Sequence, residues 1–442
     1  MKTIHPTALP LSVPARLFAF FSSFGMATVI LALLLLITLL GTLEQVDHGL
    51  FKSQQKYFES IIVPEIDMAC CLRAMHVPYD GAWMLPLPLP GGYLLMLLLA
   101  VNMICGGLIR LKKECIWFGK LLTFQFGALR PVPHRIGVFI SHFSIVFMLL
   151  AGLVSLYYKK DGAVWVHEGQ TASEFQSFHD SVIEIERVLP PSKNDKRKAM
   201  IIPGWQFEDL STGKARTFTS ADLPFELVVM NYMENAGVRR AIATDAKNMV
   251  VDGFSLQSLG ARDPDSKKPI EHEQMLNGAY VKVVDKKTRQ EQSGIIWRRA
   301  EAPYTFKVGG EVFAVSIGRR TWPLPFAVRL DKFVRETHPG TAQARKFASQ
   351  ITVMRDGHEE KKIITMNEPL RSGGFAFFQS SFDAAAASRG GPQASMFQVV
   401  SNPSDHWPLV ALIASGIGLL IHMVWMLSRH LARSSKKETA PV

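Results

Sequence analysis

Residues 137–153 read GVFISHFSIVFMLLAGL, an almost unbroken apolar run that contains one ionisable side chain, His142. A helix that crosses a bilayer needs about 20 apolar residues. Runs of this kind occur four times in the 442 residues, at 17–41, 92–109, 136–157 and 407–427. The first run is too long for a cleaved signal peptide, and no small-residue cleavage site follows it. The sequence therefore predicts a membrane protein with four transmembrane α-helices.

Basic residues are concentrated in three short segments, at 1–16, 110–135 and 428–442. Together these segments carry 12 Lys and Arg and two Glu, and thus +10 of the net charge of +11. Loops rich in Lys and Arg stay in the cytoplasm. We therefore expect both termini to be cytoplasmic. The same distribution accounts for the basic isoelectric point, so the charge gives no reason to expect a nucleic-acid partner.

This topology predicts three domains. Residues 1–157 form a membrane domain of three helices, with an outside loop at 42–91 and a basic cytoplasmic loop at 110–135. Residues 158–406 form a large β-rich extracytoplasmic domain inserted between helices 3 and 4, and residues 407–442 form helix 4 and a basic tail. Runs such as FELVVMNYM (225–233) and AYVKVVD (279–285) are typical of strands. Gly pairs and Asp-Gly pairs between such runs suit hairpins.

Several classes of protein are excluded by missing motifs. The sequence has four cysteines, none of them within 158–406, and it contains no CxxC or CxxCH. It therefore has no disulfide framework in the large domain, and it is not itself a c-type cytochrome. The P-loop, HExxH and GxSxG patterns are also absent, and we predict no catalytic residues. The adjacent Cys70 and Cys71 could form a redox or metal pair, but two thiols alone are weak support.

Two histidines lie inside apolar runs, His142 in the third and His422 in the fourth. Counting from Ile136 and from Arg429 at about 1.5 Å per residue, antiparallel helices place them about 9 and 10 Å from the same membrane face. An ionisable residue inside a membrane is a functional hypothesis by default. Neutral imidazole is also an axial ligand of haem iron. The alternative is a histidine hydrogen-bonded to a neighbouring carbonyl or serine. The apolar neighbours of His142 suit a porphyrin edge as well as helix packing: Val138, Phe139, Ile145, Val146 and Leu149.

Five longer stretches point to a family. They are GTLEQVDHGLFKSQQKYFES (41–60), the His142 run, PFAVRLDKFVRETHPGTAQARKFASQITV (325–353), MNEPLRSGGFAFFQSSFD (366–383) and NPSDHWPLVALIASGIGLLIHM (402–423). In this order, and with four helices, they resemble the ResB (also called CcsB) family of cytochrome c maturation membrane proteins. Glu44-Gln45 stands where the family has a Pro-Gln type of sequence, which suggests a divergent member.

The resemblance implies a function in cytochrome c biogenesis in the bacterial inner membrane, with the large domain in the periplasm. Such proteins act with a membrane protein of the CcsA (ResC) type, which carries a Trp-rich segment. Together they pass haem b to the outer face and attach it to the thiols of a CxxCH apocytochrome c. Because the eight tryptophans here are scattered, the chain corresponds to the accessory half of this holocytochrome c synthase and is not expected to be catalytic alone.

The resemblance also implies site residues. His142 corresponds to the family's intramembrane haem-ligand position, and His422 is the second candidate for axial ligation of the iron unless the partner supplies that ligand. His48 is a candidate outer ligand or simply part of a helix end at the interface. His406, beside Trp407, is a candidate haem contact or an interfacial anchor. The run at 367–382 is expected to be structural, with a turn at Pro369 and Gly373–Gly374.

Two other classes of protein stay open at this point. A bis-His haem b subunit of a quinone-linked redox complex would also carry paired histidines in its helices. A non-haem membrane protein with a large outside binding domain is the second alternative. If the chain is a cytochrome c maturation protein, we expect residues 158–406 to dock the apocytochrome, since an exposed sheet edge can accept an extended peptide as an added strand.

Overall fold

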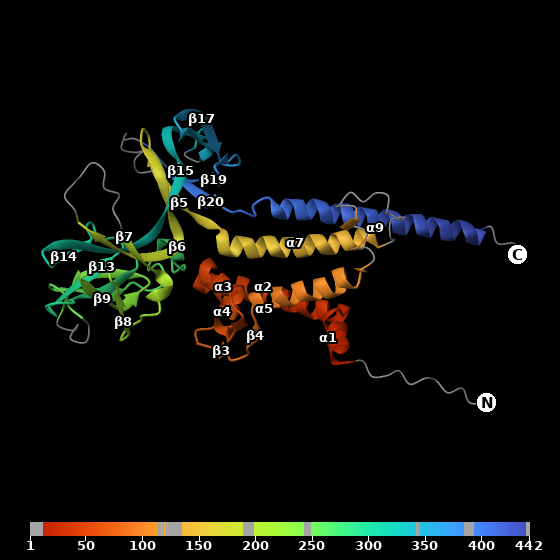
Figure 1. Cartoon of the computed structure of the whole chain (residues 1–442), viewed down its shortest axis with the longest axis horizontal. Coiled ribbons are helices and arrows are strands. Elements are labelled where there is room, and N and C mark those ends of the chain that lie inside the picture. The colour runs from red at the N-terminus through yellow and green to blue at the C-terminus, as the bar shows by residue number, and fades with distance from the viewer. Residues whose placement is uncertain are drawn as a thin grey trace. The chain divides into compact units, whose positions relative to one another are not determined.

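A computed structural model describes residues 12–112, 116, 119–120, 135–188, 199–242, 249–341, 344–383 and 393–438. The chain divides into two compact units, Met1–Lys159 with Asn402–Val442, and Lys160–Ser401. The first unit is helical and the second is built from strands (Figure 1). The predicted fold class is therefore confirmed: four candidate membrane helices, with a large β-rich domain between the third and fourth.

Four helical segments are long and apolar enough to cross a membrane. They are α2 (Phe24–His48), α5 (Gly92–Asn102) with its π-helical continuation η1 (Met103–Ile109), α7 (Ile136–Tyr158), and Trp407–Ser434 within α9 (Trp407–Glu438). The second and third agree with the predicted limits within one residue, and the fourth runs further than predicted. Together they define a multi-pass membrane protein.

The first predicted helix is displaced along the chain. The run at 17–41 is divided between α1 (Val13–Phe21) and α2, which begins at Phe24. The Ser23 side chain accepts a hydrogen bond from the Met26 backbone amide at 3.1 Å and thereby caps the new helix. Hydropathy does not register this break, because the residues on both sides are apolar. As a result α2 extends to His48, seven residues beyond the predicted end at 41.

Helices α7 and α9 pack closely through small residues. A Cβ on Gly137 would lie 2.5 Å from the Gly418 carbonyl oxygen, and one on Gly418 would lie 2.6 Å from the Ser141 hydroxyl. The Ser141 hydroxyl also lies 3.4 Å from the Ser415 carbonyl oxygen. Small residues let helix backbones approach one another where lipid removes the hydrophobic driving force between them. This contact places turns of α7 and α9 side by side, although their residues are about 280 positions apart in sequence.

The segment between α2 and α5, expected as a loop, is folded. It contains two short helices and two two-stranded sheets, β1 with β4 and β2 with β3. The first of these short helices, α3, ends at Tyr57. A core that includes Ile37, Tyr57 and Leu95 joins the segment to the membrane helices. The elements are α3 (Leu50–Tyr57), β1 (Ile62–Val63), β2 (Ile66–Asp67), α4 (Met68–Ala74), β3 (Met84–Leu85) and β4 (Leu89–Pro90).

The β unit contains a ten-stranded antiparallel sheet, a four-stranded sheet and a two-stranded ribbon. The long strands β6 (Thr171–Arg187) and β15 (Glu311–Thr337) pair with each other and belong to the largest sheet. Its order is β17-β16-β15-β6-β5-β20-β19-β18, with β14 on β15 and β7 on β6, and the smaller sheets have the orders β13-β12-β9-β8 and β10-β11. The other strands are β5 (Lys160–His167), β7 (Ala199–Pro203), β8 (Ala215–Thr219), β9 (Phe225–Met233), β10 (Ala236–Arg240), β11 (Phe254–Ser258), β12 (Gly278–Asp285), β13 (Glu291–Trp297), β14 (Tyr304–Val308), β16 (Ala344–Arg355), β17 (His358–Thr365), β18 (Leu370–Ser372), β19 (Phe375–Phe382) and β20 (Ala394–Ser401).

Two apolar cores hold the β unit together. One lies between the four-stranded sheet and the first part of β15, around Phe225, Phe306 and Phe313. The other lies against the second part of β15, around Phe377 and Phe397. Gly373 and Gly374, with φ of 56° and 81°, form the turn between β18 and β19, a conformation that glycine adopts without strain. The expected turn at Gly373–Gly374 is therefore confirmed, whereas Pro369 lies just before β18 and outside that turn.

Candidate functional site

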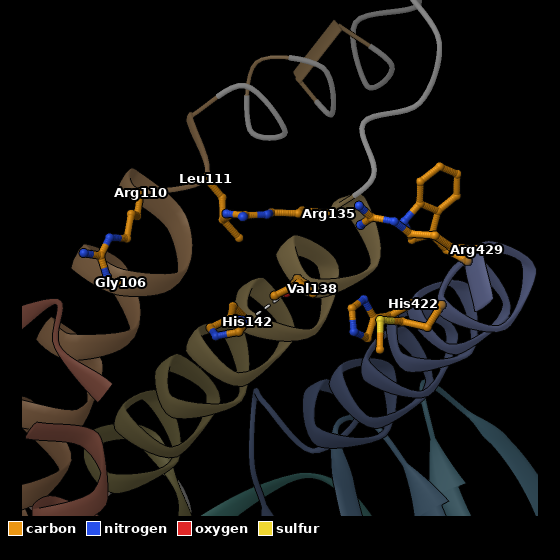
Figure 2. Close-up of a pocket in the computed structure, with 10 residues that line it drawn as sticks. Gly106, Arg110, Leu111, Arg135, Val138, His142, His422 and Arg429 are labelled. Carbon is orange, nitrogen blue, oxygen red and sulfur yellow. Dashed lines mark hydrogen bonds between the residues drawn. The ribbon is translucent and has the colours of Figure 1, made fainter. Parts of the chain in front are cut away.

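A cavity of about 360 Å³ lies within the membrane unit, among η1, α7 and α9 (Figure 2). Its volume falls in the range of about 300–1,000 Å³ that is usual for small-molecule sites. The lining contains both intramembrane histidines, three arginines and a small apolar set. The lining residues are Gly106, Arg110, Leu111, Arg135, Val138, His142, His422, Trp425, Met426 and Arg429.

His142 is held in one orientation by its own helix. Its Nδ1 lies 2.8 Å from the Val138 carbonyl oxygen, which can only accept a hydrogen bond, so Nδ1 carries the proton (Figure 2). That tautomer leaves the lone pair of Nε2 for a ligand. Gly107 packs against the ring, because a Cβ there would lie 2.4 Å from His142 Cδ2. The imidazole is thus positioned on two sides by backbone before any ligand binds.

His422 contributes the second imidazole to the same cavity. Its Nδ1 is buried and has no hydrogen-bond partner among the described residues. The close helix contact lies beside it, since a Cβ on Gly137 would be 2.7 Å from the His422 backbone nitrogen. A buried, unpaired polar atom is costly and therefore calls for a ligand or an ordered water. The unpaired nitrogen therefore leaves His422 available to a ligand or an ordered water.

Three arginines give the cavity a positive lining. Arg110 follows η1, Arg135 precedes α7 and Arg429 lies in the last third of α9. No carboxylate is among the described residues that line the cavity. Guanidinium groups bind carboxylates and phosphates through paired hydrogen bonds. The cavity can therefore combine coordination by imidazole nitrogen with binding of an anionic group.

The predicted lining is only partly correct. Val138 lines the cavity, whereas Phe139 is buried in packing against Leu111 and Ile136. Ile145, Val146 and Leu149 are not among the lining residues, so their spacing reflects helix packing. Sequence reasoning missed the arginines and the α9 face. The signal was present, because His422, Trp425, Met426 and Arg429 follow the i, i+3, i+4, i+7 spacing of one helix face.

The other two predicted histidines are not among the cavity's lining residues. His48 is the last residue of α2, and its Nε2 lies 3.2 Å from Asp67 Oδ2. His406 is exposed in the turn before α9, and the neighbouring Trp407 ring stacks on Phe147 at 5.2 Å. The α2 helix end at His48 agrees with one of its two interpretations. A haem-ligand role for His48 or His406 stays a prediction.

A buried polar cluster surrounds His48. Glu44 is 1% exposed and accepts hydrogen bonds from Lys56 Nζ, from the Tyr57 hydroxyl at 2.6 Å and from the Asp67 amide at 2.9 Å. Asp47, also buried, accepts bonds from the Arg73 guanidinium at 2.8 and 2.5 Å. This network ties α3 and α4 to the end of α2.

The thiols of Cys70 and Cys71 belong to the same cluster. Burial, and then the Asp47 carboxylate, raise the pKa of the Cys70 thiol to about 12. Burial also raises the pKa of Cys71 and, together with Glu44, that of the Tyr57 hydroxyl. These groups are therefore neutral at neutral pH in the ion-free protein. A pair of reactive thiolates is not what this environment provides.

The fold and the cavity define a multi-pass membrane protein with a large β-rich domain and a histidine- and arginine-lined site between helices. Residues 306–391, which run from β14 past the end of β19, match the model of the ResB-like family. The match covers 86 of the 442 residues. It confirms the resemblance and is consistent with a member of the ResB/CcsB family, which supports a role in cytochrome c biogenesis. A comparison with curated proteins gives no match.

Proposed function

We propose that the chain binds haem b in the cavity formed by η1, α7 and α9 and passes it across the membrane during cytochrome c maturation. One observation carries the proposal. His142 and His422, from helices far apart in sequence, line a single cavity together with Arg110, Arg135 and Arg429. Haem offers both matching features, an iron that binds neutral imidazole and two carboxylates on the porphyrin edge.

Each part of the lining has a role in this proposal. The tautomer of His142 leaves Nε2 free to hold the haem iron, and the hydrogen bond to the Val138 carbonyl keeps the ring in place. His422, in the same chain, would be the second residue to hold the iron. Arg110, Arg135 and Arg429 would bind the propionates, and Trp425 and Met426 would add apolar surface to the site.

The rest of the proposed function follows the family. The chain lies in the bacterial inner membrane with both termini cytoplasmic and the β unit in the periplasm, so the cavity faces the side where haem is made. It acts with a CcsA/ResC-type partner, which completes haem delivery and assists covalent attachment to CxxCH apocytochrome c. The +10 charge of the three basic segments supports this orientation. Alone, the chain is an accessory protein without its own catalytic residues.

The β unit is proposed to receive the apocytochrome by strand addition. The edge strands β17 and β8, one from each of the two larger sheets, differ in how well they suit this role. The edge strand β17 begins with His358 and four charged residues, and charges on an edge oppose pairing. The edge strand β8 (Ala215–Thr219) carries a single charged side chain, Arg216, and is the better candidate. A CxxCH peptide should bind the full chain, and Thr217→Pro should weaken that binding; an unchanged affinity would assign docking elsewhere.

The decisive experiment measures haem in purified variants. The chain is produced with and without His142→Ala and His422→Ala, and the haem b content per protein is measured by pyridine haemochrome. Each variant should retain less than about one tenth of the wild-type haem, because it loses one of the two proposed bonds between the protein and the iron. The fold should survive in both variants, since His422 Nδ1 has no partner among the described residues to lose and His142→Ala gives up a single side-chain hydrogen bond, to the Val138 carbonyl.

His430→Ala is the matched control, because His430 lies on α9, as His422 does, but is exposed and is not a lining residue of the cavity. It should leave the haem content unchanged. If His142→Ala inserts normally and copurifies with wild-type haem and an unchanged Soret band, the proposal is wrong. If His142→Ala loses most of its haem and His422→Ala loses little, the partner supplies the second ligand. Reduction of bound haem by quinol would instead indicate a quinone-linked redox subunit.

A further inference from the structure

A second group of side chains of the types that ligate metals lies at the C-terminal end of α2. The imidazole of His48, the carboxylate of Asp67 and the thiol of Cys70 place their ligand atoms within 4.8 Å of one another. None of the three residues lines the histidine and arginine cavity. The group contains one nitrogen, one oxygen and one sulfur donor, and it is open to solvent through His48, whose side chain is 46% exposed.

Local structure fixes two of the three donors. The backbone amide of Cys70 donates to Asp67 Oδ1 at 2.9 Å, so the carboxylate caps α4 and its second oxygen is directed to His48 Nε2 at 3.2 Å. Cys70 is buried beside the last turns of α2, with Sγ 3.6 Å from the Glu44 carbonyl oxygen. The donors of one zinc ion lie roughly 3–4 Å apart, since each is about 2.0–2.3 Å from the metal. His48 Nε2 and Asp67 Oδ2, at 3.2 Å, already have that spacing, and all three ligand atoms lie within 4.8 Å of one another.

The surrounding charges favour a cation. Three carboxylates lie close together, and each has a different partner. Glu44 is paired with Lys56 at 2.8 Å and Asp47 with Arg73 at 2.5 Å, whereas Asp67 faces the His48 imidazole. A divalent cation bound between His48 and Asp67 would place a positive charge beside the Asp67 carboxylate, as Lys56 and Arg73 do for the other two.

We propose that His48, Asp67 and Cys70 form a binding site for a divalent cation of the zinc class, with a fourth position open to water or to an exogenous ligand. Mixed imidazole, carboxylate and thiolate donors suit zinc and its neighbours rather than magnesium or calcium. On binding, the metal–sulfur bond replaces the S–H bond and the proton passes to solvent. The site does not depend on haem binding by the cavity, and no oxidation or reduction is involved.

The test uses the full, untagged chain in detergent micelles. The protein is titrated with Co²⁺, a spectroscopic substitute for zinc, and separately with Zn²⁺, followed by desalting and metal analysis. One equivalent of metal is expected, and the Co²⁺ form should show a thiolate-to-metal charge-transfer band. His48→Ala and Cys70→Ser should each weaken binding at least about tenfold. Asp67→Asn should also weaken it, while the amide oxygen still caps α4.

His76→Ala and Cys105→Ser are the matched controls, one a histidine of the same folded segment and the other a described thiol outside the group. Both should bind metal as the wild type does. Absence of a stoichiometric metal with a thiolate band, or binding that His48→Ala leaves unchanged, overturns the proposal. His48 is partly exposed, so this variant is informative even if Cys70→Ser fails to fold. Haem content measured on the same samples separates this result from the proposed haem function.

Discussion

Histidines occur in two polar regions of the membrane unit, and the charges around them are opposite. His142 and His422 share a cavity with three arginines, and the described residues of its lining include no carboxylate. His48 lies beside a carboxylate cluster of Glu44, Asp47 and Asp67. An imidazole can ligate a metal in either setting. The surrounding charges favour ligands of opposite charge: an anionic ligand in the cavity and a cation at the carboxylate cluster.

The two regions also differ in what they contribute to folding. In the carboxylate cluster, almost every donor and acceptor has a protein partner, and the network joins three helices. In the cavity, His422 Nδ1 lacks a partner among the described residues, and Arg110 donates to the Ser22 carbonyl at 3.3 Å. A satisfied network stabilises the fold, and an unpaired buried group is available for a ligand or a water. Substitution of the paired carboxylate Glu44 should therefore affect stability, and substitutions in the cavity should affect binding.

The largest effect is expected from Glu44→Ala. This change removes the acceptor of Lys56, of the buried Tyr57 hydroxyl and of the Asp67 amide, and leaves the partly buried Lys56 ammonium without its carboxylate. The free energy of unfolding should fall by about 3–5 kcal/mol. Thermal unfolding in detergent, followed by tryptophan fluorescence, measures the loss. A wild-type melting temperature for Glu44→Ala would show that the cluster is not what holds α3 and α4.

Next in size is Gly107→Ala, which should act on the cavity. The new methyl group would lie 2.4 Å from His142 Cδ2 and must displace the imidazole or η1. Such overpacking costs about 1–3 kcal/mol, and we expect roughly tenfold weaker haem binding. Gly152→Ala on α7 is the control, because nothing lies within 4 Å of its Cβ position. Equal haem titrations for the two variants would remove His142 from the site.

Loss of cavity arginines should have a smaller and more selective effect. Arg135→Gln and Arg429→Gln each remove one charged partner of a propionate, which is worth about 1.5–3 kcal/mol at most and less where water screens the site. Haem affinity should fall several-fold, and more at low salt. Binding of haem dimethyl ester, which has no propionate charge, should be unaffected. Arg433→Gln, exposed on α9 and outside the lining, should change neither affinity.

The smallest effect is expected for His406→Ala. This histidine is exposed in the turn before α9 and is not a lining residue of the cavity. We expect a change in stability within about 0.5 kcal/mol and an unchanged haem content. Pyridine haemochrome and thermal unfolding of the same sample measure both. A loss of haem comparable to that of His142→Ala would instead make His406 a ligand, as one of its two interpretations holds.

Long apolar runs and β-branched segments were enough to predict the architecture. Three of the four membrane helices and the nature of the inserted domain were correct, because bilayer thickness and strand periodicity leave few alternatives. The first helix was misplaced, since the Ser22–Ser23 break lies between residues of equal hydropathy. The folded segment at 49–91 was missed as well. Its stability comes from packing on α2 and from Glu44, contacts that local patterns do not contain.

The candidate site was predictable only in part. Counting residues placed His142 and His422 at similar depth, and tertiary structure alone brought them to one cavity, because the Gly137–Gly418 contact decides which faces of α7 and α9 meet. The tautomer of His142, the unpaired nitrogen of His422 and the three converging arginines also required coordinates. The meeting of His48 with Asp67 and Cys70 is equally a product of the fold. The sequence by itself determined the helices, the charge asymmetry of the segments that flank them, and the presence of histidines within them. Packing decided which residues these histidines meet, since contacts between distant residues depend on side-chain shape and not on periodicity.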